Sequence, residues 1–272
     1  MTDLYAVIGN PIAHSKSPFI HTEFSRQTGQ AMRYEALLAP LDGFAKTVNA
    51  FRQQGGKGMN VTVPFKLAAH KLVTQLTERA SMAQAVNTIK FDEDRILGDN
   101  TDGIGLERDI TNNLGIPISD KRILLMGAGG AARGVILPLL EANPKILVIA
   151  NRTKSKAHAL HQQFAAYGKL ASGDFADLSG ENFDIIINAT SASLHDALPP
   201  LPAGIFCRQS LAYDMMYSQK LTPFLTFAQQ QGAKYLADGT GMLVEQAAES
   251  FFLWRDVRPE TKHVIELLKL ST

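Results

Sequence analysis

One glycine-rich stretch, RILLMGAGGAARGVILPLLE at residues 122–141, constrains the fold of this chain most strongly. An apolar, strand-like run leads into glycines and then into a helix-like run. Gly127, Gly129 and Ala132 fit the pattern G-x-G-x-x-G/A. In that pattern the first glycine permits a tight turn, the second lets the backbone approach a pyrophosphate, and the small third residue lets helix and strand pack closely. A glycine-rich turn without a ligand is the alternative, but the strand–turn–helix context favours a dinucleotide-binding Rossmann unit whose helix N-terminus receives the phosphates.

The residues after the next strand-like run indicate which dinucleotide is bound. The run KILVIANRTKSK, residues 145–156, has no acidic residue near Asn151, where NAD sites usually carry one for the ribose 2′-hydroxyl. It has Arg152, Thr153 and Lys156 instead, and a guanidinium pairs well with a 2′-phosphate. An ordinary basic helix start is the alternative. Because cations at a helix N-terminus oppose its dipole, a bound anion explains them better, and the sequence predicts NADP(H).

Strand-like and helix-like segments alternate along the whole chain, beginning with the strand-like runs at 4–8 and 33–39. This alternation predicts an α/β protein with parallel sheets covered by helices on both faces. A length of 272 residues suggests about two domains. The segment LGIPISDK, residues 114–121, is a plausible entry into a new domain.

Composition excludes several classes of protein. Hydrophobic residues make up 45% of the chain and charged residues 19%, so it can form a full core. A net charge of +1 does not indicate a nucleic-acid or membrane partner. Cys207 is the only cysteine, which excludes an intrachain disulfide and a cysteine metal cage. With no secretory signal pattern in the first residues and no apolar stretch of membrane-helix length, we expect a cytoplasmic protein.

The stretch NVTVPFK, residues 60–66, ends a strand-like run with Lys66. A surface lysine that opens the next helix is one interpretation. The other is a reactive lysine at the carboxyl end of a strand, where open α/β sheets place their ligands.

Motifs over both halves of the chain resemble those of the shikimate dehydrogenases, in the same order, and the NADP-specific biosynthetic branch is the most similar. They are GNPIAHSKSP (9–18), NVTVPFK (60–66), AVNT (85–88), DNTDG (99–103), GAGGA (127–131), NRT (151–153), NAT (188–190), YDMMY (213–217) and DGTGMLVEQA (238–247). The resemblance implies reversible, NADPH-dependent reduction of 3-dehydroshikimate to shikimate in aromatic amino-acid biosynthesis. It also implies a substrate domain of residues 1–102 completed by helices at 238–272, an NADP-binding Rossmann domain of 103–237, and an active site in the cleft between them.

The same resemblance assigns roles to individual residues. Lys66 matches the catalytic lysine, and Asp102 is its partner and also binds the substrate. Ser15 and Ser17 resemble the carboxylate-binding pair, and Tyr217 resembles the tyrosine that closes over the carboxylate. The residues that match those holding the ring hydroxyls are Thr62, Asn87, Asp102 and Gln246. The residues that match cofactor-binding positions are Glu78, Gly127, Ala128, Gly129, Gly130, Ala131, Asn151, Arg152, Thr153, Lys154, Ser155, Lys156, Met215 and Gly239.

The chain departs from the family pattern in one loop. The family often has a glycine two or three residues after NATS, whereas this chain has Ser193, Leu194 and His195. Two alternatives stay open: a quinate/shikimate dehydrogenase with relaxed cofactor use, and a non-catalytic NADP-binding regulator of the same fold. The first is disfavoured by Arg152, and the second by the presence of both Lys66 and Asp102. No metal is expected, and the chain is expected to be a monomer or a homodimer.

Overall fold

The structure, a computed structural model, describes residues 2–190, 192, 197–218 and 220–270. It divides into two compact units. The first comprises Met1–Gly105 and Leu243–Leu267, and the second comprises Leu106–Met242 and Leu268–Thr272. The chain therefore passes between units within three helices, α5 (Asp102–Arg108), α9 (Thr240–Arg255) and α10 (Lys262–Leu270). The sequence-based boundaries, after residues 102 and 237, lie a few residues before the first two of these points.

The first unit is built on a six-stranded mixed sheet of order β2-β1-β3-β5-β6-β4. The strands are β1 (Asp3–Gly9), β2 (Met32–Leu38), β3 (Gly56–Val61), β4 (Gln75–Leu76), β5 (Thr88–Phe91) and β6 (Ile96–Asp99). The expectation of parallel strands is wrong for β5, which runs antiparallel to both β3 and β6. A tight turn in which the Asp92 amide donates to the Arg95 carbonyl at 3.0 Å joins β5 to β6. Parallel strands need a crossover of a dozen or more residues, so this short connection requires a hairpin.

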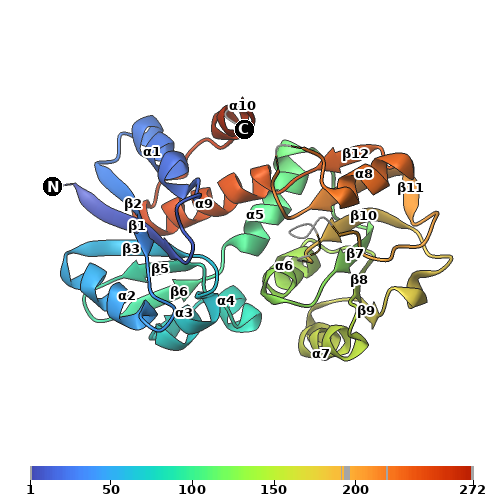
Figure 1. Ribbon diagram of the computed structural model, residues 1–272, viewed down its shortest axis with the longest axis horizontal. Coiled ribbons are helices and arrows are strands. Elements are labelled where there is room, and N and C mark those ends of the chain that lie inside the picture. Colours follow the sequence, from blue (N-terminus) through green and yellow to red (C-terminus); the bar gives the residue numbers. More distant parts are fainter. Residues whose placement is uncertain (1, 191, 193–196, 219, 271–272) are drawn as a thin grey trace. The chain divides into compact units, whose positions relative to one another are not determined.

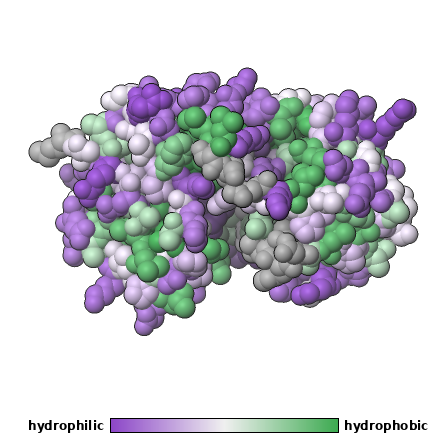
Figure 2. All heavy atoms as spheres, turned by 45° about the horizontal axis from the view of Figure 1, so that its top comes forward, coloured by the Kyte–Doolittle hydropathy of each residue, from purple (hydrophilic) through white to green (hydrophobic). Residues whose placement is uncertain are grey.

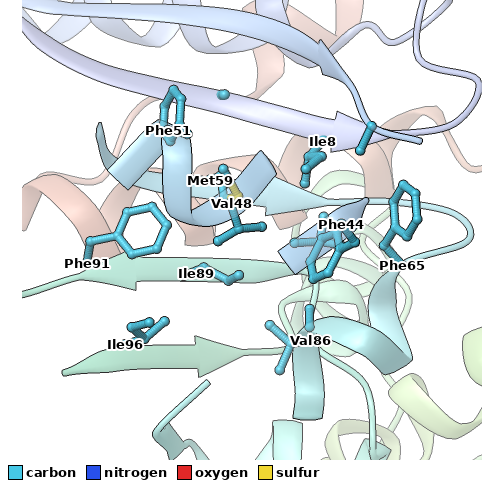
Figure 3. Close-up of a cluster of buried hydrophobic side chains, with 14 of the residues drawn as sticks. Ile8, Phe44, Val48, Phe51, Met59, Phe65, Val86, Ile89, Phe91 and Ile96 are labelled. Atoms are coloured by element: carbon cyan, nitrogen blue, oxygen red, sulfur yellow. The ribbon is translucent and has the colours of Figure 1, made fainter. Parts of the chain in front are cut away.

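Helices cover both faces of this sheet (Figure 1). Their bounds are α1 (Ser17–Thr28), α2 (Phe44–Gln53), α3 (Lys66–Leu72), α4 (Glu78–Ala83), α9, and α10 (Lys262–Leu270). Phe44, Val48 and Phe51 of α2 share one helix face because they are four and three residues apart. That face packs on Met59 and Ile89 of the sheet in a buried cluster (Figure 3).

The opposite face of the sheet carries an aromatic cluster. Tyr5 and Tyr34 project from the strands, and Trp254 arrives from α9 and stacks on Tyr5 with ring centroids 4.8 Å apart. His21 of α1 is completely buried and stacks on Tyr34 at 4.2 Å. α1 and α9 are therefore held on this face by ring contacts.

The second unit is built on a fully parallel sheet of order β12-β11-β10-β7-β8-β9. Its strands are β7 (Arg122–Met126), β8 (Ile146–Ala150), β9 (Leu170–Gly173), β10 (Phe183–Asn188), β11 (Phe206–Asp214) and β12 (Tyr235–Ala237). Its main helices are α6 (Gly130–Glu141), α7 (Lys154–Phe164) and α8 (Pro223–Gln230), and a short π-helix (Asp109–Asn113) follows α5. Counted from β7, the strand order is 6-5-4-1-2-3, the arrangement that binds dinucleotides where the order reverses. That point lies between β7 and β10, and the expectation of a two-domain α/β fold with a Rossmann-type domain is confirmed.

Hydrophilic and hydrophobic residues are interspersed on the face of the molecule in Figure 2. Apolar atoms normally form a large part of a folded protein's surface, so small apolar patches need no special explanation. Among the described residues, none of the helices is both long enough and apolar enough to cross a bilayer.

Candidate active site

One edge of the first sheet collects most of the residues assigned to the substrate. β1, β3 and β6 all end at this edge, and the antiparallel β5 begins there, because Asn60 at the end of β3 pairs with Thr88 at the start of β5. Asn87 directly precedes β5, and Asp102 follows β6 by three residues. The hairpin that the sequence did not predict is thus what brings Asn87 beside Asp102.

Lys66 and Asp102 form an ion pair with Nζ 2.5 Å from Oδ2. Lys66 is the first residue of α3, and Asp102 is the first residue of α5. A cation at a helix N-terminus opposes the dipole, whereas a carboxylate at the same position is favoured by it. Asp102 therefore offers Lys66 the negative partner that its own helix does not. The lysine side chain is 30% exposed and the aspartate side chain 11%, so the ammonium is shielded yet accessible to a ligand.

The side chain of Asn87 fixes the other oxygen of Asp102. The main-chain amide of Thr101 donates to Asn87 Oδ1 at 2.9 Å, so the amide oxygen faces Thr101. Asn87 Nδ2 then faces Asp102 and donates to its Oδ1 at 2.8 Å. The backbone donor determines which way the amide is turned. Each carboxylate oxygen of Asp102 has its own donor, which fixes the position of the acceptor that holds Lys66.

A buried hydroxyl and amide network lies beneath this pair, and the sequence interpretation missed it. Asn60 is 5% exposed and donates from Nδ2 to Ser250 Oγ at 2.9 Å and to Thr88 Oγ1 at 3.2 Å. Thr88 in turn donates to Asn87 Oδ1 at 2.8 Å. A buried asparagine in a strand is a recognisable signal, because such groups need partners. Ser250 lies 190 positions away along the chain, and nothing local could have linked it to Asn60.

The other assigned substrate residues differ in how closely they join this group. Gln246 Oε1 lies 3.4 Å from Asn87 Nδ2 and also 3.4 Å from Thr101 Oγ1. Thr62 follows β3, and Ser15 follows β1 and accepts a hydrogen bond from the Ser17 amide at 3.3 Å. These residues lie at the same edge of the sheet without a direct bond to Lys66. This part of the site therefore offers hydroxyl and amide groups around one ammonium and one carboxylate.

Tyr217 belongs to the second unit and follows β11. It is 40% exposed, and its partial burial raises the pKa of its hydroxyl above the usual value. The hydroxyl is therefore protonated at neutral pH and available as a hydrogen-bond donor.

The glycine-rich loop between β7 and α6 has the shape that a pyrophosphate requires. Gly127 has φ +110°, a left-handed conformation that residues with a Cβ rarely adopt. A Cβ on it would lie 3.0 Å from the carbonyl oxygen of Ala189 in the loop after β10. Gly129 and Gly130 are exposed, and a Cβ on either would meet no atom within 4 Å. Open space above glycines at a helix N-terminus fits a phosphate group and the unpaired first-turn amides of α6, so the residues present, including Ala128 and Ala131, fit a dinucleotide.

The basic residues after β8 do not all have the same surroundings. Residues 152–156 are exposed, and Asn151 Nδ2 donates to the Thr153 carbonyl, which holds the start of α7. Lys154 Nζ lies 2.7 Å from Asp177 Oδ2, and that carboxylate raises the pKa of Lys154. Within the described part of the chain, Arg152 and Lys156 have no ion-pair partner. These two cations are therefore better placed than Lys154 to bind a phosphate, whereas the exposed Ser155 offers only a hydroxyl.

Met215 and Gly239 lie against each other in the second unit. Gly239 is buried, and a Cβ on it would overlap the Met215 carbonyl, so only glycine fits there. The Gly239 amide donates to the Met216 carbonyl at 3.1 Å. Glu78, in contrast, is an exposed residue of the first unit and opens α4.

Two expectations from the sequence concern an atypical loop and the absence of a metal site. Ser193, Leu194 and His195, at which the chain departs from the family pattern, lie outside the described residues. Across the described ranges, no group of three or more His, Cys, Asp or Glu side chains could hold a metal ion.

Comparisons with known proteins agree over almost the whole chain. Three family models match in chain order: Shikimate dehydrogenase substrate binding domain at residues 7–89, Shikimate / quinate 5-dehydrogenase at 109–196, and Shikimate 5'-dehydrogenase C-terminal domain at 239–269. The curated Shikimate dehydrogenase (NADP(+)) of Nitrosospira multiformis is 68% identical over 271 residues, which covers 100% of this chain and 98% of the relative. The protein of the same name from Nitrosomonas eutropha is 63% identical and covers 98% of this chain and 97% of its own.

Solved structures are similar to the same extent. An Ael1 enzyme from Pseudomonas putida is 52% identical with a TM-score of 0.94, over 98% of both chains. The shikimate 5-dehydrogenase of Thermus thermophilus, solved in complex with NADP(H) and shikimate, is 31% identical with a TM-score of 0.87 and covers 100% of both chains.

Proposed function

Because this chain belongs to the shikimate dehydrogenase family, we propose that it reduces 3-dehydroshikimate to shikimate with NADPH, reversibly, as an oxidoreductase of aromatic amino-acid biosynthesis. The observation that carries this activity is the Lys66–Asp102 ion pair, held at the edge of the first sheet among hydroxyl and amide groups. A cyclic keto acid with several hydroxyls needs such a surface, since each of its polar groups requires a partner when it leaves water.

The reaction converts a ketone to an alcohol, and the protein has to manage the charge on oxygen. NADPH, when bound, supplies the hydride to the carbonyl carbon. Negative charge then develops on the carbonyl oxygen, which must receive a proton. A lysine ammonium has donors and no acceptor, so we assign to Lys66 the roles of proton donor and of stabilising the developing charge. Asp102 orients the ammonium and accepts a hydrogen bond from a substrate hydroxyl.

The remaining assigned residues bind and orient the substrate. Ser15, Ser17 and the Tyr217 hydroxyl supply donors for its carboxylate. Thr62, Asn87 and Gln246 bond its ring hydroxyls. A site built to bond hydroxyls rejects analogues that lack them by a factor of about 10⁴ or more, so the substrate is recognised through its hydroxyls as well as its carboxylate.

The cofactor is held by the second unit. The loop from Gly127 to Ala131 receives the pyrophosphate, and Arg152 with Lys156 binds the 2′-phosphate. Met215 and Gly239 lie beside the nicotinamide. This assignment makes NADP(H) the preferred cofactor over NAD(H), because no acidic side chain follows β8 to bond a free 2′-hydroxyl.

The test is the oxidation of NADPH with 3-dehydroshikimate, measured beside NADH with the same substrate and beside quinate with NADP and NAD. Activity with NADPH and 3-dehydroshikimate that exceeds the other combinations supports the proposal. Equal efficiency with both cofactors, or with quinate, indicates the relaxed quinate/shikimate enzyme instead. Binding of NADPH without turnover of any substrate indicates a regulator.

Lys66→Met tests the assignment of the proton donor. General acid catalysis contributes about 10²–10⁴-fold, so we expect turnover to fall by about two decades or more while the Michaelis constant of the substrate changes little. NADPH affinity serves as the control for folding and should equal that of the parent. Near-normal turnover would show that Lys66 has no catalytic role and is an ordinary lysine at the start of a helix.

Location and assembly remain predictions of the sequence. We propose a cytoplasmic protein on the basis of its single cysteine, and a monomer or homodimer.

A further inference from the structure

We propose that the buried pair Asp214 and Asn188 positions the loops that receive the nicotinamide end of the cofactor. This inference rests on the proposed function. Neither residue has a role in the substrate or cofactor assignments above, although both stand in quoted motifs, YDMMY and NAT. Asn188 is the last residue of β10, Asp214 is the last residue of β11, and they are register partners in the parallel sheet. Both are fully buried.

The carboxylate of Asp214 binds three separate segments. It accepts hydrogen bonds from Thr222 Oγ1 at 2.6 Å, from Asn188 Nδ2 at 3.2 Å, and from the Met216 main-chain amide at 3.1 Å. Thr222 is the N-cap of α8 and also accepts from the Leu225 amide. One carboxylate therefore fixes both ends of the segment from Met216 to Thr222, within which Tyr217 lies.

Asp214 and Asn188 together form what we call the clamp. Asn188 extends it to the loop after β10. Its Nδ2 donates to Asp214, and its Oδ1 accepts from the Thr190 amide at 3.2 Å and from the Thr190 hydroxyl at 2.7 Å. Its main-chain carbonyl accepts from the Met215 amide at 3.0 Å. The two loops that leave β10 and β11 are thus tied to one buried amide.

The clamp also reaches the glycine-rich loop. Between Asn188 and Thr190, the Ala189 amide donates to the Met126 carbonyl at 2.9 Å, at the end of β7. The Ala189 carbonyl lies against Gly127, where a Cβ would approach to 3.0 Å. Moving Ala189 would therefore disturb the first glycine of the phosphate loop. Asp214 and Asn188 set the spacing between that loop and Met215, at the point where the strand order of the sheet reverses.

A purely structural role predicts something different. If the pair served only to stabilise the unit, weakening it would lower stability without distinguishing one end of the cofactor from the other. If the pair positions the nicotinamide end, the adenosine end should be spared, because Arg152 and Lys156 belong to the separate segment that follows β8. A cofactor fragment that contains only the adenosine end separates the two explanations.

The experiment compares NADPH with 2′,5′-ADP, which carries the adenosine and its 2′-phosphate but no nicotinamide. For Asp214→Asn, we expect the dissociation constant of NADPH to rise about tenfold, as loss of one hydrogen bond to a charged group allows. That of 2′,5′-ADP should stay within about twofold of the parent, and turnover should fall. Equal weakening of both ligands, or no change in either, would overturn the inference.

A second variant controls for loss of a carboxylate from the same sheet, at the half-buried Asp184. Asp184 lies at the opposite end of β10 and accepts a hydrogen bond from the Arg122 amide at 2.8 Å. Asp184→Asn should leave the ratio of the two dissociation constants at the parent value. A shift of that ratio as large as in Asp214→Asn would also overturn the inference.

If Asp214→Asn fails to fold, Thr222→Val removes one donor from the same carboxylate, and Thr222→Ser keeps that donor as its control. The valine variant should weaken NADPH selectively and the serine variant should not; loss of both ligands alike in the valine variant refutes the clamp. Ligand binding by the parent protein distinguishes a failure of the proposed function from a failure of the clamp. Failure of the parent to bind NADPH and 2′,5′-ADP refutes the proposed function, whereas normal binding by the parent leaves only the clamp under test.

Discussion

His21 should make the stability of this protein depend on pH. Its ring is completely buried among aromatic side chains, and Nε2 lies 3.1 Å from Asn60 Oδ1. Asn60 Oδ1 is an acceptor that also receives the Tyr34 hydroxyl at 2.7 Å, so the neutral ring donates from Nε2. Nδ1 has no hydrogen-bond partner in the described structure. Burial therefore lowers the pKa of His21 from 6.5 to about 3.

The sign of the effect follows from the two protonation states. Above the unfolded pKa of 6.5, His21 is neutral in both the folded and the unfolded chain and adds no pH dependence. As the pH falls from 6.5 towards 3, the unfolded chain takes up a proton that the folded protein excludes. Stability should then decrease by about 1.4 kcal/mol per pH unit, which amounts to about 2 kcal/mol between pH 7 and pH 5.

The assay is urea unfolding at pH 7 and at pH 5, followed by tryptophan fluorescence, for the parent and for His21→Phe. The phenylalanine ring keeps the contacts with Phe24 and Tyr34 but cannot titrate. Other groups titrate in both proteins and cancel in the comparison. We expect the parent to lose about 2 kcal/mol more than the variant between the two pH values. An equal loss in both would refute a neutral, buried His21.

Three further changes test other parts of the structure. Arg152→Ala should raise the Michaelis constant of NADPH about tenfold or more and leave that of 3-dehydroshikimate unchanged, because a charged hydrogen bond contributes about 1.5–3 kcal/mol; similar changes for both would exclude a 2′-phosphate contact. Ser15→Ala should weaken shikimate but not NADP in calorimetry, and equal weakening would make its role structural. Arg79→Met should lower the unfolding free energy by about 3–5 kcal/mol. The Asp99 side chain is 1% exposed, and the variant leaves its carboxylate without the bidentate partner. An unchanged urea midpoint would contradict this expectation.

The sequence predicted what is encoded locally. The glycine-rich turn, the strands on either side of it and the absence of an acid after β8 could all be read within about 30 residues. Lys66 and Asp102 are predicted through the family resemblance, and the structure places their charged atoms in contact.

The parts that could not be predicted depend on distant residues. β4, β9 and β12 have only two to four residues each, so their periodicity is too short to recognise. The antiparallel direction of β5 follows from a turn whose geometry resembles many loops. Lys154 looks equivalent to Arg152 and Lys156 in the sequence, and only the fold brings Asp177, 23 positions away, beside it. Asn188 and Asp214 matter only through their pairing across neighbouring strands.

The return of α9 to the first unit has a consequence for the order in which the protein folds during synthesis. Trp254, the only tryptophan, donates from Nε1 to the Ile89 carbonyl at 2.9 Å, across 165 positions of sequence. Ribosomes add about 5–20 residues per second, so the first 105 residues should wait about 7–30 s before α9 is complete. During that interval one face of the first sheet lacks its α9 cover, and Asn60 lacks Ser250. We therefore expect the nascent chain to present a chaperone-accessible surface at this stage, and the change in Trp254 emission to report the last docking event rather than the first collapse.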